Sequence, residues 1–247
     1  MGILLPDDHR ADLCYDQIHR WLHRRKKEIN LPDSPTNIAD IRREYMLEAL
    51  DEAVAGQDPL LFFKKWFAEA EAAEITDINA MTLATADAQG IPHARIVLLK
   101  GLDQEGFVFF TNYDSAKGID INSNPRAALV FYWKELERQV RIEGFVEKIN
   151  GEESDIYFKS RPEGSRIGAW ASPQSRTIVH RNILDVNYAK YKEEFSEIDI
   201  PRPPHWGGYR VMPSHIEFWQ GRVSRMHDRI VFNKTSEGSW ERSRLAP

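Results

Sequence analysis

Residues 81–99, MTLATADAQGIPHARIVLL, indicate the fold class of this chain. Met81, Leu83 and Thr85 alternate with small residues, which is the period of a strand with one buried face. The tetrapeptide DAQG then supplies turn formers, and the apolar run within His93–Leu99 predicts a returning strand. The stretch therefore predicts an antiparallel hairpin.

More short strands with tight turns between them are predicted along the rest of the chain. Consecutive strands of this kind are typical of an antiparallel barrel, so we expect a mainly β (α+β) fold with flanking helices. The further strands are predicted at residues 107–111, 127–133, 139–148, 208–212, 215–220, 229–233 and 240–245. Helices are predicted at residues 41–55, from Asp58 onward, and at 115–123, 152–160 and 181–195.

The helix that follows Asp58 carries clear start signals and an apolar stripe. Asp58 suits the N-cap position and Pro59 suits the first turn. The stripe, formed by Phe63, Trp66, Phe67 and Ala70, has helical spacing, and we interpret it as core and not as a cofactor site.

Composition narrows the function class. A net charge of -5 over 247 residues argues against a nucleic-acid binder, so clusters of Arg and Lys are expected to be local sites for small anions. Cys14 is the single cysteine, which excludes an intramolecular disulfide and a cysteine-based zinc site. No membrane span or signal peptide is predicted, and we expect a cytoplasmic protein. Because GxGxxG, HExxH and GxSxG motifs are missing from the sequence, we expect neither a Rossmann site nor a metal site.

The segment RMHDR, Arg225 to Arg229, has a cationic or titratable side chain at every second position. In a strand, Arg225, His227 and Arg229 would share one face. These side chains repel one another and lose hydration on burial unless an anion lies opposite them. The pattern predicts an anion-binding strand, although a solvated, charged edge strand explains it equally well.

Other cationic residues also suggest anion sites. Arg95 and Lys100 bracket the apolar run IVLL, and strict strand alternation would place them on opposite faces, serving different anionic groups. Residues 111–117, TNYDSAK, join a strand to a helix start, where backbone N–H groups and the Lys would suit a phosphate, although a simple helix cap would look the same.

A third candidate anion site combines a phenol, a guanidinium and a hydroxyl. Tyr157, Arg161 and Ser165 lie four residues apart, so in a helical or near-helical run they would converge on one patch that suits a phosphate monoester. Two separate phosphate sites would predict two phosphorylated ligands.

The chain resembles the pyridoxine/pyridoxamine 5′-phosphate oxidase family over roughly residues 40–247. The resemblance is carried, in order, by the strings ARIVLLKG, FFTNYDSAKG, NPRAALVFYW, ERQVRIEG, YFKSRPEGSRIGAWAS, WGGYR, IEFWQGR, SRMHDRIVF and the terminal RLAP. It implies one FMN-binding split β-barrel domain at 41–247. It also implies a homodimer with two FMN at the subunit interface. Residues 1–40 fall outside the resemblance, and their sequence predicts a polar, helical and mobile extension.

The activity that the resemblance implies is an oxidation in vitamin B6 salvage. Pyridoxine 5′-phosphate and pyridoxamine 5′-phosphate would be converted to pyridoxal 5′-phosphate with O2 as the acceptor, giving hydrogen peroxide, and ammonia from the amine. The alternative is a non-catalytic protein of the same fold that binds or carries a flavin or pyridoxal phosphate.

The resemblance also assigns residues to roles. The catalytic pair is Arg225 and His227. The FMN-binding positions are Arg95, Ile96, Val97, Leu98, Phe110, Thr111, Ala116, Lys117, Gln139, Gln174, Ser175, Trp219 and Arg229. The substrate-binding positions are Arg42, Arg43, Glu44, Tyr45, Lys100, Tyr157, Arg161, Ser165, Arg225, Met226 and His227.

One departure from the family pattern bears on cofactor affinity. This chain has Ser115-Ala116-Lys117 where the family usually has Ser-Arg-Lys. Losing one charge-assisted hydrogen bond costs about 1.5–3 kcal/mol, or roughly tenfold to a hundredfold in affinity. We therefore expect FMN binding to be weakened and not abolished.

Overall fold

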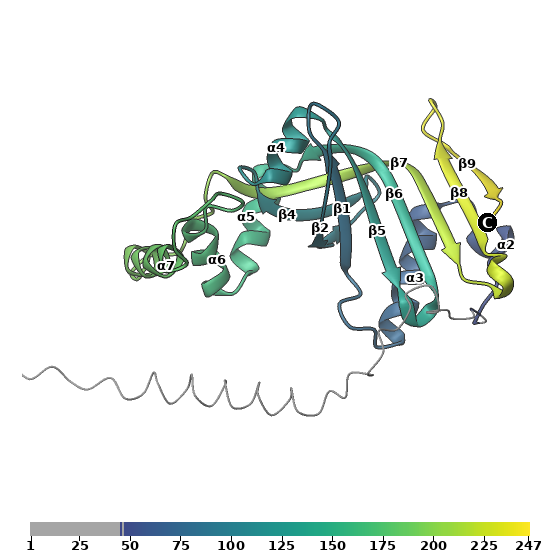
Figure 1. Ribbon diagram of the computed structural model, residues 1–247, viewed down its shortest axis with the longest axis horizontal. Helices are drawn as coiled ribbons and strands as arrows, with labels where there is room; N and C mark the ends of the chain where they lie inside the picture. The colour runs from purple at the N-terminus through teal and green to yellow at the C-terminus, as the bar shows by residue number, and fades with distance from the viewer. Residues whose placement is uncertain (1–44, 46) are drawn as a thin grey trace, which may run out of the picture. The chain divides into compact units, whose positions relative to one another are not determined.

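A curled antiparallel sheet forms the centre of the described part of this computed structural model, which comprises Tyr45 and residues 47–247 (Figure 1). The strand order is β2-β1-β5-β6-β7-β4-β3, and β8 pairs with β7 and β9. The strands are β1 (Ala80–Ala86), β2 (Pro92–Leu98), β3 (Gly101–Leu102), β4 (Phe107–Asn112), β5 (Arg126–Trp133), β6 (Arg138–Lys148), β7 (Trp206–Gln220), β8 (Asp228–Lys234) and β9 (Trp240–Leu245). The predicted antiparallel, split-barrel class is confirmed.

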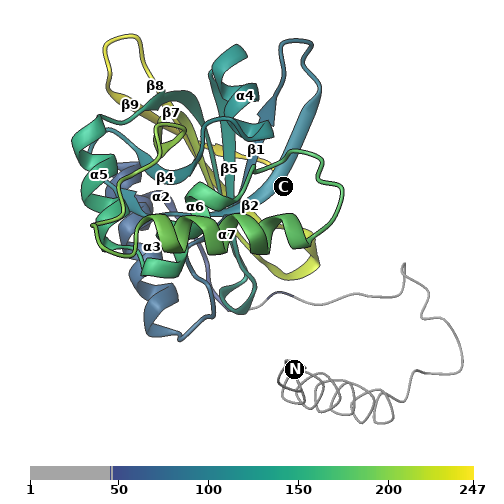
Figure 2. The same ribbon diagram turned by 90° about the vertical axis from the view of Figure 1, so that its left-hand side faces the viewer.

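Six α-helices accompany the sheet in the part of the chain that the structure describes. They are α2 (Glu52–Ala55), α3 (Pro59–Ala72), α4 (Ala116–Ser123), α5 (Gly151–Ser160), α6 (Glu163–Ala171) and α7 (Asn182–Glu194). Figure 1 shows α5, α6 and α7 gathered at one end of the sheet, and Figure 2 views the molecule from that end. None of the helices in this part is long and apolar enough to cross a membrane.

One face of the sheet forms the main core together with α3. Alternate residues of the central strands, such as Leu129 and Phe218, are fully buried. The α3 stripe packs on them, with ring centroids 5.3 Å apart for Trp66 and Phe218 and 5.0 Å apart for Phe63 and Phe131. Because a buried side chain of this size contributes about 1.5–3 kcal/mol, this layer anchors the sheet. The stripe was predicted as core, and the structure confirms this.

The opposite face of the same strands is only half-covered. Cross-strand register aligns Tyr132 with Gln139, Gln139 with Trp219, and Trp219 with Arg229. On the edge strand β2, Ile96 is 65% exposed. We call the residues of β2, β1, β5, β6, β7 and β8 that point away from the core the outer face of the sheet.

The predicted helix ends are confirmed where local capping determines them. The Asp58 side chain accepts hydrogen bonds from the backbone N–H groups of Leu60 and Leu61 at the start of α3. The Ser115 hydroxyl caps α4 by accepting from Gly118. Such caps satisfy backbone donors that have no partner inside the helix, so the signal is local and legible in sequence.

The predicted helix at 41–55 is wrong over residues 47–51, and only Glu52–Ala55 is helical. Side chains from distant segments bond the backbone there instead. The Leu50 N–H donates to Asp228, and the Glu48 carbonyl accepts from Arg222. Residues 41–44 and 46, like the predicted extension at 1–40, lie outside the described residues.

Two further expectations about the elements need correction. The strands predicted at 208–212 and 215–220 form one continuous strand, β7, which passes through Pro213 beside a register shift at Glu143/Gly144. Helix α6 was not predicted as a separate element. It begins directly after Pro162 and buries Ile167 in a second apolar cluster with Phe158.

Candidate functional site

A cavity of about 700 Å³ lies where β2, β4, α4 and the α5–α6 connection meet. Most of the predicted phosphate-binding and flavin-binding residues line it. These are Arg95, Ile96, Val97, Leu98, Lys100, Phe110, Thr111, Lys117, Tyr157, Arg161, Ser165 and Gln174. Arg95 and Lys100 therefore serve one cavity. Strand β2 ends at Leu98, so the strand alternation on which the prediction of opposite faces rested does not extend to residue 100, and that prediction stays untested.

Lys117 is a buried cation whose immediate partners are hydroxyl groups. Its Nζ donates to Thr111 Oγ1 and Ser115 Oγ, both at 3.2 Å, and it is 8% exposed. Among the described residues, no carboxylate lies within ion-pair distance of it. Burial, aided by the nearby Arg95 charge, lowers the pKa of Lys117. A buried ammonium group in this setting is best satisfied by an anion brought from outside.

Arg95 is held in place from behind. Its Nη1 donates to Thr85 Oγ1 at 2.7 Å, and its Nη2 lies 3.7 Å from Asp120 Oδ2. That oxygen also accepts from the Thr85 hydroxyl at 2.6 Å and lies 3.0 Å from His93 Nδ1. Burial acts to raise the pKa of Asp120, but the bonds from Thr85 and His93 hold it below its usual value. Asp120 therefore stays ionised and steadies the Arg95 guanidinium.

Arg161 is a second cation at the same cavity, and one of its nitrogens lacks a hydrogen-bond partner in the described part of the chain. Its guanidinium lies over the Trp206 ring, 4.6 Å from the centroid, and its buried Nη1 has no hydrogen-bond partner. Burial lowers the pKa of Arg161. Tyr157 stacks on Phe110 at 3.9 Å, which fixes the phenol beside the guanidinium. Arg161 is extended backbone between α5 and α6, so the run is not one helix, but Tyr157, Arg161 and Ser165 do line the same cavity.

A second group of predicted residues lies on the outer face, toward β8 and β9. The Trp219 and His227 rings are 4.6 Å apart, and the Tyr45 ring packs edge-on at 5.7 Å from each of them. Gln139 and Arg229 are the register partners of Trp219 on β6 and β8. This group therefore joins predicted substrate residues with predicted flavin residues.

Arg225, His227 and Arg229 do not share one strand face, so that prediction is wrong. Val223–Arg225 form a short 3-10 turn, and Ser224 and Arg225 have positive φ values of 54° and 61°. Strand β8 begins only at Asp228. The segment is a turn that leads into a strand. It is therefore neither a strand that carries all three side chains nor a charged edge strand.

His227 is held as a neutral imidazole. Its Nδ1 accepts a hydrogen bond from the Arg222 backbone N–H at 3.1 Å, which places the ring proton on Nε2. Burial first, and then the Arg225 charge, lower the pKa of His227 from 6.5. The side chain therefore offers a hydrogen-bond donor at neutral pH.

Arg229 is fixed by a buried carboxylate that sequence reasoning missed. Glu217 accepts from Arg229 Nε at 2.8 Å and from Nη2 at 3.1 Å, and it also accepts from Arg141 at 3.1 Å. The hydrogen bond that Arg229 donates to Glu217 is the main reason that the pKa of Arg229 is raised. The alternation of β7 could have indicated this, because Glu217 shares the outer face with Trp219.

The remaining predicted residues are placed as follows. Gln174 accepts from the Thr111 hydroxyl at 3.3 Å, whereas Ser175 is exposed with a φ of 67°. Ala116 is exposed at the first residue of α4, and Met226 is 67% exposed. Arg42, Arg43 and Glu44 lie outside the described residues.

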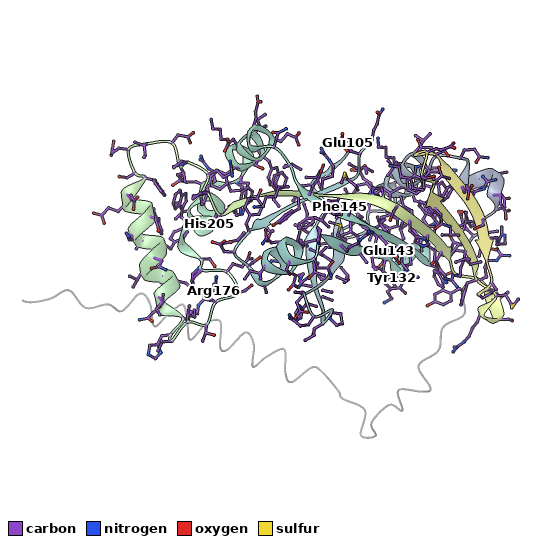
Figure 3. All side chains as sticks on the ribbon, turned by 90° about the horizontal axis from the view of Figure 1, so that it is seen from above. Glu105, Tyr132, Glu143, Phe145, Arg176 and His205 are labelled. Atoms are coloured by element: carbon purple, nitrogen blue, oxygen red, sulfur yellow. The ribbon has the colours of Figure 1, made fainter. Side chains whose placement is uncertain are left out.

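The cavity and the outer-face group are separate within one protomer. Strand β4, which lines the cavity, pairs with residues 206–211 at the start of β7, whereas Trp219 lies near the other end of β7. Along β7 itself, Trp206 at the cavity and Trp219 are about 40 Å apart in an extended strand. Figure 3 labels His205 toward the α6–α7 end and Tyr132 toward the β8–β9 end.

Two models of known protein families match this chain. The family described as pyridoxamine 5′-phosphate oxidase matches residues 67–194, and the pyridoxine 5′-phosphate oxidase C-terminal dimerisation region matches residues 206–247. The chain belongs to the pyridoxamine 5′-phosphate oxidase family. The predicted family resemblance is confirmed.

Individual members of the family are similar over nearly their whole length. A pyridoxine/pyridoxamine 5′-phosphate oxidase of Cupriavidus metallidurans is 56% identical over 212 residues, covering 86% of this chain and 100% of that protein. The oxidase of the same name from Nostoc sp. is 54% identical over 210 residues, covering 85% and 98%.

Solved structures carry the same fold. PhzG from Burkholderia lata, crystallised with tetrahydrophenazine-1-carboxylic acid, has a TM-score of 0.76 at 28% identity and covers 81% of this chain and 99% of its own. An FMN-binding protein related to pyridoxamine 5′-phosphate oxidase, from Nostoc punctiforme, has a TM-score of 0.61 at 18% identity and covers 75% and 97%. The latter supports the fold alone.

Proposed function

We propose that this protein is an FMN-dependent oxidase that converts pyridoxine 5′-phosphate and pyridoxamine 5′-phosphate to pyridoxal 5′-phosphate. The observation that carries the proposal is a single cavity with two cations, Lys117 and Arg161, whose described surroundings lack an acidic partner. Two phosphorylated ligands, a cofactor and a substrate, would satisfy both. The family membership and the names of its close relatives support the same activity.

The residues at the β4–α4 end of the cavity fit the phosphate of FMN. Lys117, Arg95 and the Thr111 hydroxyl provide charge and hydrogen-bond donors beside the first turn of α4. Gln174 reaches the same place from the loop after α6. When bound, FMN supplies the redox chemistry, taking two electrons from the substrate and passing them to O2, which leaves as hydrogen peroxide.

The α5–α6 connection is the proposed clamp for the substrate phosphate. Arg161, Tyr157 and Ser165 would hold the phosphate, with Lys100 contributing a further charge. A clamp distant from the reacting carbon orients the substrate and so lowers the entropic part of the barrier. Removing it would therefore weaken substrate binding and turnover together.

Arg225 and His227 are proposed to orient the pyridine side of the substrate. With its proton on Nε2, His227 donates a hydrogen bond, and Arg225 adds positive charge. These groups would polarise the ring substituents, and a separate general base is not required by the arrangement. Tyr45, packed against His227, would shield the substrate from water.

A homodimer is proposed to bring the two groups together. Within one protomer the cavity and the Trp219 group lie at opposite ends of β7, yet both carry residues predicted for the same ligands. The half-covered outer face, with Ile96 65% and Leu98 41% exposed, would be covered by a second copy. The match of residues 206–247 to a dimerisation region supports this. A cytoplasmic location is proposed from the single cysteine.

The test is direct assay of the purified protein. Its flavin absorbance is recorded, FMN is added, and hydrogen peroxide is followed with each of the two B6 phosphates. We expect peroxide and pyridoxal 5′-phosphate in equal amounts. Bound FMN without turnover of either substrate would refute the oxidase and favour the non-catalytic binder.

A further inference from the structure

Arg244 on β9 makes four hydrogen bonds that tie three distant segments together. Its Nε and Nη2 donate to the two carboxylate oxygens of Glu52 at 2.8 and 3.0 Å. Its Nη1 donates to Asp228 Oδ1 at 2.8 Å, and its Nη2 also donates to the Leu50 carbonyl at 3.1 Å. A bidentate guanidinium pair of this kind fixes orientation as well as charge.

Asp228 completes the connection. It stands between His227 and Arg229 at the start of β8, and its second oxygen accepts from the Leu50 backbone N–H at 3.1 Å. The Asp228 carboxylate thus bonds both β9 and the segment before α2. We call residues 47–51 the strap, because this irregular segment, which ends where α2 begins at Glu52, is held to β8 and β9 by side-chain bonds to its backbone.

The strap and the His227 turn are connected at other points as well. Arg222 donates from Nη1 to the Glu48 carbonyl at 3.0 Å, while its backbone N–H holds His227 Nδ1. The Leu47 N–H donates to Glu137. The strap begins two residues after Tyr45, whose ring packs on Trp219 and His227.

We propose that Arg244 is a positioning residue for substrate binding: through Asp228 and Glu52 it fastens the strap to the His227 turn, and so sets Tyr45 and His227 in the arrangement that receives the substrate. The proposal rests on the proposed function for its substrate. Arg244 acts through its partners and lies outside the cavity that holds the predicted phosphate sites.

We call the ion pairs of Arg244 with Glu52 and Asp228 the clasp. Its groups stay charged over the working pH range. The hydrogen bond from Arg244 is the main reason that the pKa of Glu52 falls to about 2. Since this folded-state pKa is lowered, the contribution of the pair is present above the normal Glu pKa of 4.5 and is lost only as the pH falls toward 2. The clasp is therefore a constant element and not a pH switch near neutrality.

Arg242 provides a matched control on the same strand. It lies two residues before Arg244 and also anchors the α2 region, since its Nη1 donates to the carbonyls of Glu52 and Gly56. In the described contacts it does not bond Asp228. An effect of general anchoring would appear in both variants, whereas an effect of the clasp would appear only at Arg244.

The experiment compares the FMN-loaded wild-type enzyme with R244Q, R244K, E52Q and R242Q. Loss of the charge-assisted bonds in R244Q is expected to raise KM for pyridoxine 5′-phosphate roughly tenfold, with kcat and the Kd of FMN changed less than about threefold. R244K and E52Q should give intermediate KM values, because each keeps part of the clasp. R242Q should stay within about twofold of wild type, the level expected of peripheral contacts.

A second readout does not depend on turnover. In an NMR titration of the His227 imidazole, R244Q should raise the His227 pKa toward 6.5, because a loosened turn is better hydrated, while R242Q should leave it unchanged. An unchanged KM and titration in R244Q, or equal changes in R242Q, would overturn the proposal. If the wild-type protein oxidises neither B6 phosphate, the proposed function fails, and the titration still decides whether the clasp exists.

Discussion

At the scale of single residues, Lys117 keeps its charge in a buried position among hydroxyl groups. We expect Lys117→Met to weaken FMN binding roughly tenfold to a hundredfold, because a charge-assisted bond to phosphate is lost. The same change should raise the melting temperature of the cofactor-free protein, since a poorly solvated charge is removed. Fluorescence titration and thermal melting measure the two effects. Lys148→Met is the control, because Lys148 is exposed and lies over the Tyr113 ring.

Lys117→Met leaving the Kd of FMN at its wild-type value would show that the anion binds elsewhere. A fall in affinity together with a fall in the melting temperature of the cofactor-free protein would instead indicate that Lys117 has a structural role.

Ala116 is the residue at which an added charge should help. It is exposed at the first residue of α4, next to Lys117, so a longer side chain meets no buried neighbour. We expect Ala116→Arg to tighten FMN binding by roughly tenfold through one added charge-assisted bond. Ala116→Gln, of similar length but neutral, should give little gain. Equal affinities for all three proteins, measured by titration, would remove Ala116 from the FMN site.

The lowered pKa of His227 determines how stability and activity are expected to change with pH. Burial and the Arg225 charge lower its pKa, so the folded protein resists protonation that the unfolded chain accepts below 6.5. Neutral His227 therefore contributes to the stability of the folded protein. The contribution is complete above pH 6.5 and is lost as the pH falls from 6.5 through the lowered pKa of the folded protein. Arg225→Gln removes one of the two causes, so the acid limb of kcat/KM should move to higher pH.

The exposed Arg176 gives a control for the general loss of one positive charge. Arg176→Gln should leave the acid limb where it is. An acid limb that stays in place in Arg225→Gln would separate that limb from His227.

At the scale of elements, the approach of Tyr45 to the end of β7 depends on a glycine. A Cβ on Gly221 would stand 2.8 Å from Tyr45 Cγ, closer than side chains pack. Gly221→Ala should therefore push the ring off Trp219 and His227 and raise KM for the substrate several-fold, a loss of about 1 kcal/mol of contact. Steady-state kinetics and thermal melting give the two readouts.

Gly168 in α6 supplies the comparison, because a Cβ there meets nothing within 4 Å. Gly168→Ala should stabilise the protein by about 0.5–1 kcal/mol through helix propensity and leave KM alone. If the KM of Gly221→Ala were the same as that of Gly168→Ala, Tyr45 would have no part in substrate binding.

At the scale of the whole molecule, the outer face of the sheet is the surface on which the proposed dimer depends. Tyr132 is 53% exposed there and aligns with Gln139. We expect Tyr132→Glu to shift the protein toward monomer in analytical ultracentrifugation and to weaken FMN binding, because a charge buried at an interface is costly. Val186→Glu on α7, 65% exposed, should change neither. A Tyr132→Glu protein that remains dimeric would place the interface elsewhere.

Much of the secondary structure was predictable because its causes are local. Alternation in β1 and the caps at Asp58 and Ser115 depend on residues a few positions apart. The sequence predicted that Lys117 and Arg161 are cations of the site. It did not predict that they lack an acidic partner among the described residues. Whether Lys117 meets a carboxylate depends on which strands and helices surround it.

The sequence by itself determined the fold class, the family and the residue types of the candidate site, since strand period, caps and motif spacing are properties of the chain. Only the tertiary structure decided that β7 is continuous, that residues 47–51 form a strap, and that Arg225 and His227 lie on a turn. It also separated the predicted site residues into two groups at opposite ends of β7. The physical reason is that partners such as Glu217, Asp228 and Arg244 act across the sheet, where distance along the chain says nothing about distance in space.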